Sequence, residues 1–86
     1  MKWELEIASS AKREMRRLSD NQLRRINQKI LQLVSNPFPQ GTVRLKDGNG
    51  YRIRVGNWRI LYDVYTEERR IVIYAVGHRS RVYKNL

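Results

Sequence analysis

The sequence predicts an α+β fold with the order β-α-α-β-β-β, in which a helical hairpin packs on one face of a mostly antiparallel four-stranded sheet. Three observations favour this class. The first residues alternate polar and apolar, the next thirty repeat apolar side chains at helical spacing, and the second half contains three strand-like runs separated by turn residues. With 86 residues and no linker or internal repeat, residues 1–86 are expected to form a single domain.

The N-terminal segment predicts one strand followed by a short helix. Residues 2–7 alternate so that Trp3, Leu5 and Ile7 share one face, as in a half-buried strand. Either Ser9 or Ser10 is a suitable cap for the first helix. The apolar stripe of that helix has helical spacing and consists of Ala8, Ala11, Met15 and Leu18.

A second helix follows almost at once. Ser19 and Gln22 have the spacing of a capping box, and Asp20 is favourably placed at the positive end of the helix dipole. The inward positions of this helix are Leu23, Ile26, Ile30 and Leu33. Pro37 ends the helix. Because so few residues separate the two helices, we expect them to be antiparallel.

The remaining chain predicts three strands after a loop. The loop spans residues 37–50, and only residues 42–46 within it suggest a short extended piece. The three predicted strands are 51–55, 58–65 and 70–76. Gly56 and Asn57 indicate the first hairpin turn. The last strand is apolar on both faces, which favours a central position, and Gly77 ends it before a basic tail.

Two arginines dominate the first of these three strands. Strand alternation places Tyr51, Ile53 and Val55 on one face and Arg52 and Arg54 on the other. A guanidinium stays charged and binds phosphate through two parallel hydrogen bonds, so the pair suggests a phosphate-rich ligand on an open sheet face. The alternative is that both arginines are simply solvated positions of an exposed face.

The next strand adds a third arginine to this face. Trp58, Ile60, Tyr62 and Val64 share one side and resemble core residues. Arg59 lies on the other side, which it shares with Asp63. An ion pair between Arg59 and Asp63 is the alternative to ligand binding, but exposed pairs of this kind contribute little to stability.

The C-terminal tail supplies further candidates. If the tail stays extended, Arg79, Arg81 and Tyr83 lie on one side and suit single-stranded RNA, with guanidinium on phosphate and ring on base. A frayed terminus is the alternative. His78 is a candidate acid or base, although strand parity points it away from Arg79 and a hydrogen-bonded strand-end histidine is slightly favoured.

Composition narrows the choice of partner. Lys and Arg number 18 against 8 acidic residues, a formal net charge of +10. So large an excess favours nucleic acid first, an acidic protein second and a membrane surface third. The absence of cysteine excludes disulfides, and a single histidine makes a metal site improbable, so we expect no metal and no cofactor. The charged N-terminus is unlike a signal peptide, which favours a cytoplasmic location.

Four motifs together resemble the RelE/ParE toxin superfamily, and the RelE branch more than the ParE branch. The resemblance covers essentially the whole chain, and the motifs that carry it are Asn36-Pro37, Arg44-Leu45-Lys46, the block from Tyr51 to Tyr62, and the ending from Ala75 to Tyr83. The resemblance implies the toxin of a type II toxin–antitoxin pair. Such a toxin would enter the ribosomal A site and cut mRNA without a metal, by attack of a ribose 2′-OH on the adjacent phosphate. Its second partner would be an acidic antitoxin protein.

The resemblance also implies roles for individual residues. Arg52 and Arg54 match the two basic strand residues of the RelE motif, and Arg59 matches its phosphate-clamping arginine. Arg79 matches the basic residue assigned to the leaving group, and Tyr83 matches the tyrosine that orients the base. Further RNA contacts are expected from Arg44, Lys46, His78 and Arg81.

Two departures from the family pattern qualify these roles. Arginine effectively never loses its proton, so Arg54 is a poor proton acceptor where the best-known relative has lysine. We therefore expect a charge clamp with weak acid–base assistance. No C-terminal helix follows Tyr83, so an antitoxin is expected to cover the basic face directly. A ParE-like toxin acting on DNA gyrase and a non-catalytic RNA-binding or partner-binding module of the same fold are the alternative functions.

Overall fold

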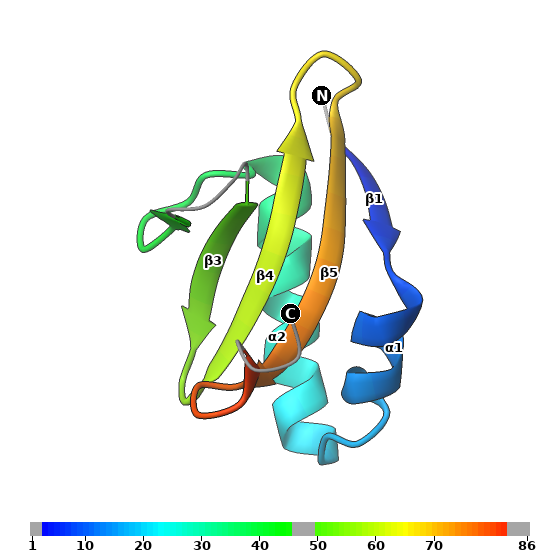
Figure 1. Cartoon of the computed structure of the whole chain (residues 1–86), viewed down its shortest axis with the longest axis vertical. Coiled ribbons are helices and arrows are strands. Elements are labelled where there is room, and N and C mark those ends of the chain that lie inside the picture. Colours follow the sequence, from blue (N-terminus) through cyan, green and yellow to red (C-terminus); the bar gives the residue numbers. More distant parts are fainter. Residues whose placement is uncertain (1–2, 46–49, 83–86) are drawn as a thin grey trace.

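The computed structural model describes residues 3–45 and 50–82, and these residues form two helices and five strands (Figure 1). In chain order the elements are β1 (Glu4–Ile7), α1 (Ser9–Met15), α2 (Asp20–Ser35), β2 (Val43–Arg44), β3 (Gly50–Val55), β4 (Trp58–Tyr65) and β5 (Arg70–His78). The predicted α+β class and its helical hairpin are confirmed. No helix among the described residues combines the length and apolarity needed to cross a membrane.

The strands form one mixed sheet in the order β1-β5-β4-β3-β2. Strand β1 is parallel to β5, and the other neighbours are antiparallel. The predicted number of four strands is wrong for the described residues, because Val43 and Arg44 pair with β3 as a fifth. Strand β2 lies within the short extended piece suggested at residues 42–46, and only the pairing shows that it belongs to the sheet. The central position of β5, between β1 and β4, is confirmed.

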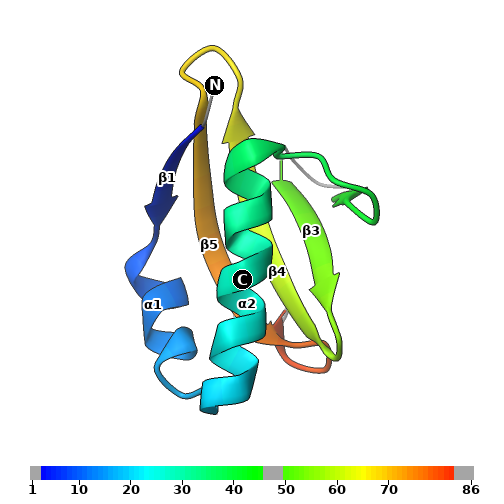
Figure 2. The same ribbon diagram turned by 180° about the vertical axis from the view of Figure 1, so that it is seen from behind.

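The two helices cover one face of the sheet unequally. In Figure 2 the helix α2 lies in front of the sheet, over β4 and next to β5, and α1 lies antiparallel to it beside β5. The capping box of α2 is present, since Ser19 Oγ accepts from Gln22 N at 3.3 Å and Gln22 Oε1 accepts from Ser19 N at 3.2 Å. The predicted serine cap of α1 is wrong. Ala8 occupies the cap without a side-chain bond, and Ser10 Oγ donates instead to the Tyr74 carbonyl at 3.0 Å.

The core lies between the sheet and the helices. Its fully buried members come from both helices and the three long strands, and Tyr62 is the largest of them. The Tyr62 hydroxyl donates to the Pro37 carbonyl at 2.7 Å, and burial raises the pKa of this phenol. Trp3 and Ile7 pack against this core, whereas Leu5, expected on the same face, is 38% exposed.

A bulge in β5 changes which side chains at the end of that strand face the helices. The register with β4 shifts between Leu61 and Tyr62, which pair with Ala75 and Ile73, so Tyr74 is the extra residue. The strand continues two residues beyond its predicted end at 76, because Gly77 and His78 still pair with β4.

Candidate nucleic-acid interface

The face of the sheet turned away from α2 carries the arginines of β3. Ile53 and Val55 are buried in the core, whereas Arg54 is exposed on the opposite face. Arg52 lies on that same open face and is half-buried, with its Nε atom shielded from solvent. The alternation predicted for this strand is therefore confirmed, and it fixes two guanidiniums at neighbouring positions on one side.

The third arginine stands directly opposite the second. Arg54 and Arg59 are cross-strand partners, so their β-carbons are expected to lie about 5 Å apart. Arg59 is only 7% exposed, and its Nη1 donates to the carbonyls of Gly56 at 3.2 Å and Trp58 at 3.0 Å. These bonds anchor the Arg59 head at the β3–β4 turn. Two like charges held in this way create a strong local preference for an anion.

The C-terminal tail turns back instead of remaining extended. Arg79 N donates to the Asn57 carbonyl at 2.9 Å, and Arg81 N donates to the His78 carbonyl at 2.9 Å. Val82 is then buried at 2% exposure. The expected extended tail is therefore wrong for residues 79–82. The turn brings the main chain of Arg79 beside the β3–β4 turn, at the same end of the sheet as Arg54 and Arg59.

Gly77 is the physical reason why the tail can turn back. This glycine pairs with Arg59 in the sheet, and a β-carbon at position 77 would stand 3.2 Å from the β-carbon of Val82. Val82 thus fills the space that a larger residue would occupy. The sequence pattern identified Gly77 only as a strand end, whereas its role is to admit Val82 against the sheet.

The other end of the open face contains a polar group that the sequence did not indicate. A β-carbon at position 50 would stand 2.8 Å from the hydroxyl of Tyr74 and 3.4 Å from Oδ1 of Asp63. Both groups therefore approach the space left by Gly50. Burial raises the pKa of the Asp63 carboxyl. Asp63 was predicted on this face, and Tyr74 joins it because it alternates with Ile71 and Ile73, which face the core.

His78 lies apart from the arginine set. It pairs with Trp58, whose ring it meets edge to face at a centroid distance of 5.7 Å, and this partner belongs to the helix-facing side of β4. The Nδ1 atom accepts from Ser80 N at 3.2 Å and lies 2.9 Å from Ser80 Oγ. Because a main-chain N–H can only donate, the neutral ring carries its proton on Nε2.

The structure does not group all predicted RNA contacts. Arg44 is paired with Tyr51, which packs against the core and stacks on Tyr62, so Arg44 belongs to the side of the sheet opposite Arg52. Lys46 and Tyr83 lie outside the described residues. The set that the described residues bring together is thus Arg52, Arg54 and Arg59 on the open face, with Arg79 at its end.

The fold and this face define a small basic α+β protein with an arginine-rich sheet surface, and comparisons with known proteins show its family. The family model described as "ParE toxin of type II toxin-antitoxin system, parDE" matches residues 5–83. A Methanocaldococcus jannaschii protein that carries the name toxin RelE1 is 30% identical over 99% of both chains.

Solved structures share the fold. The RelE–RelB complex of Pyrococcus horikoshii has a TM-score of 0.83 at 23% identity, covering 95% of this chain and 100% of that chain. The RelBE2 complex of Mycobacterium tuberculosis has a TM-score of 0.82 at 22% identity, covering 92% of this chain and 100% of that chain. The isolated Escherichia coli RelE toxin has a TM-score of 0.78 at 23% identity, covering 96% of this chain and 93% of that chain. The chain therefore belongs to the RelE/ParE superfamily of type II toxin–antitoxin toxins.

Proposed function

We propose that this toxin is a ribosome-dependent mRNA endonuclease that cuts mRNA in the A site and so stops translation. The observation that carries the proposal is the direct opposition of Arg54 and Arg59 across β3 and β4. Like charges placed opposite one another in a sheet are destabilising unless a ligand compensates them. A bridging phosphate is the ligand that two guanidiniums suit best.

The proposed reaction is an internal transfer at phosphorus. The ribose 2′-oxygen forms a bond to the adjacent phosphorus, the bond from phosphorus to the 5′-oxygen breaks, and the 2′-proton leaves as the 5′-oxygen gains one. Arg54 and Arg59 stabilise the negative charge that builds on the phosphoryl oxygens. We propose that Arg79 assists the leaving oxygen, which is supported by its main chain being fixed at the β3–β4 turn, and that Arg52 extends the clamp along the RNA backbone.

The same face is proposed to bind the antitoxin. The Pyrococcus and Mycobacterium relatives were solved as complexes with their antitoxins. An acidic segment that folds on the arginine face would neutralise the clamp and exclude RNA at once. The antitoxin of this chain is therefore expected to be acidic, and the pair is expected in the cytoplasm, where ribosomes are found.

Cleavage of mRNA on programmed ribosomes tests the proposal. Primer extension should reveal a cut in the A-site codon with the wild-type chain, and strongly reduced cutting with Arg54→Gln or Arg79→Ala. Arg16→Gln, which removes an exposed arginine of the helical hairpin, is the matched control and should cut normally. Intact mRNA with the wild-type chain would overturn the enzymatic proposal, and gyrase-dependent DNA breaks would replace it with the ParE-like alternative.

The pH dependence of cleavage tests the charge-clamp mechanism separately. A clamp of arginines keeps its charge throughout the neutral range, so the rate should vary little between about pH 6 and 8. A steep profile that disappears in His78→Ala would show that the histidine transfers a proton in the rate-limiting step.

A further inference from the structure

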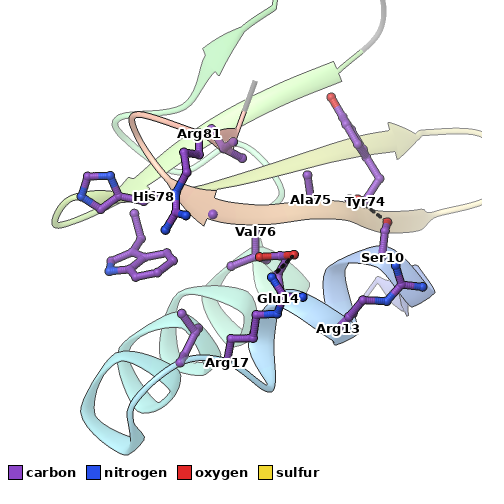
Figure 3. A pocket seen from close by; sticks show the side chains of 13 residues that line it. Ser10, Arg13, Glu14, Arg17, Tyr74, Ala75, Val76, His78 and Arg81 are labelled. Atoms are coloured by element: carbon purple, nitrogen blue, oxygen red, sulfur yellow. Dashed lines mark hydrogen bonds and ion pairs between the residues drawn. The ribbon is translucent and has the colours of Figure 1, made fainter. Parts of the chain in front are cut away.

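A cleft surrounds the part of β5 that β1 does not reach. Strand β1 pairs with β5 only as far as Ile73, and beyond that point the strand edge faces α1 and the turn after it. The cleft has a volume of about 810 Å³ and runs from α1 around this edge to the C-terminal turn (Figure 3). It is distinct from the arginine face, because Arg52, Arg54 and Arg59 do not line it.

The charge of the cleft is positive. Arg13 and Arg17 line it from the hairpin side and Arg81 from the C-terminal turn, so guanidiniums stand on both sides of the strand (Figure 3). All three are exposed. Glu14 also lines the cleft and lies 3.7 Å from Arg17, which leaves an excess of positive charge from Arg13 and Arg81.

An aromatic side chain provides a flat part of the cleft surface. Trp58 and Tyr74 both line the cleft and neither is fully buried, but the Tyr74 ring points away from α1 toward Gly50, so Trp58 is the ring on the helix-facing side (Figure 3). Flat rings beside guanidiniums are the combination that binds single-stranded nucleic acid, because bases stack on the rings while phosphates meet the arginines. An acidic peptide would use the positive charges but would gain less from the rings.

The cleft is also continuous with the arginine face. Gly77 lines the cleft and is the cross-strand partner of Arg59. A chain of nucleotides leaving the Arg54–Arg59 pair therefore reaches the cleft after passing one strand, a distance of about 5 Å between neighbouring strands. One nucleotide spans this distance.

We infer that the cleft between α1 and β5 is a second nucleotide subsite, which holds a nucleotide flanking the phosphate bound on the arginine face. The inference rests on the proposed function, since it assumes that the arginine face binds RNA. The base stacks on Trp58, and the flanking phosphates meet the guanidiniums of Arg13 and Arg17 on one side of the strand and Arg81 on the other.

Trp58 provides a direct test, because the chain has two tryptophans and the other, Trp3, lies under Arg69 at the β4–β5 turn, the opposite end of β4 from Trp58. In a Trp3→Phe background, Trp58 is the sole tryptophan and reports on the cleft alone. Titration with a 2′-O-methyl RNA tetranucleotide, which cannot be cleaved by its own 2′-oxygen, should quench Trp58 fluorescence. A Trp58→Phe variant that keeps Trp3 should show no quenching. Saturating RNA that binds without quenching Trp58 would overturn the inference.

A matched pair of charge variants tests the arginines. Arg13→Gln/Arg17→Gln removes two positive charges from the cleft, whereas Lys12→Gln/Arg16→Gln removes two from the other side of the same helical segment. The first variant should weaken tetranucleotide binding by about tenfold and lower the slope of log affinity against log salt by about 1.4, the value for two contacts to a single strand. The control should retain most of the slope and the full quenching of Trp58.

Equal weakening by both variants would overturn the inference, since it would show long-range attraction without a local site. Stronger quenching by a poly-glutamate peptide than by RNA would also overturn it and assign the cleft to an acidic protein partner. Ribosomal cleavage reports on the proposed function, whereas Trp58 quenching by an uncleavable oligonucleotide reports on the cleft, so the two failures are distinguishable.

Discussion

The opposition of Arg54 and Arg59 predicts that removing one of the two charges stabilises the free protein while it destroys function. Two unit charges about 6 Å apart repel by roughly 0.7 kcal/mol in a water-like medium, which suits the exposed Arg54. Arg54→Gln should therefore raise the free energy of unfolding by about this amount. For a domain of this size that corresponds to a melting temperature about 3–5 °C higher.

Thermal unfolding followed by circular dichroism measures this effect. The gain should be largest at low ionic strength and should shrink in about 0.3 M salt, because salt screens exposed charges. Arg16→Gln is the control for the general relief of net positive charge, and its effect should be smaller. The reasoning is refuted if Arg54→Gln is no more stable than Arg16→Gln at low salt, or if its gain is independent of salt.

Three further substitutions test the surrounding structure. Tyr62→Phe leaves the buried Pro37 carbonyl without its donor, and chemical denaturation should show a loss of about 1–3 kcal/mol. Gly77→Ala places a β-carbon 3.2 Å from that of Val82, and the resulting overpacking should cost about 1–3 kcal/mol in the same assay. Burial raises the pKa of Asp63, so its charged form is disfavoured in the folded state and stability falls as pH rises through the folded pKa. Asp63→Asn should thus melt slightly higher than wild type at pH 7, and this difference should vanish below about pH 4.

Local patterns predicted most of the elements of this fold. The alternation from Tyr51 to Val55 fixed which side chains face the core, because a strand places successive residues on opposite faces. The capping box between Ser19 and Gln22 located the start of α2 to within one residue. Signals of this kind lie within a few residues of one another, so the sequence displays them directly.

Features that depend on distant contacts were missed. The pairing of Val43 with Arg52 is one example, since the extended piece suggested at residues 42–46 does not indicate its partner strand. The bulge at Tyr74, which moves Val76 and His78 to the helix-facing side, is another, because it arises from the register between two strands. The return of the tail depends on Val82 finding the space beside Gly77. Each of these contacts joins residues whose proximity only the folded chain creates.

The geometry of the described residues also bears on which group could accept the proton of the 2′-hydroxyl. His78 holds its Nδ1 in hydrogen bonds to Ser80 and pairs with Trp58 on the helix-facing side. Asp63 shares the open face, but it is four residues along β4 from Arg59, a separation of about 13 Å. A base must approach within about 3 Å of the proton that it removes.

Neither group therefore reaches a 2′-hydroxyl beside a phosphate held by Arg54 and Arg59 without a large movement. Under the proposed function, the arginine face would supply charge, and the proton acceptor is best sought in the ribosome–mRNA complex. This division explains in physical terms why such a protein would depend on the ribosome. Free mRNA bound to the same face should be cut far more slowly than A-site mRNA. Equal rates on free and ribosome-bound mRNA at matched occupancy would place the acceptor within the toxin itself.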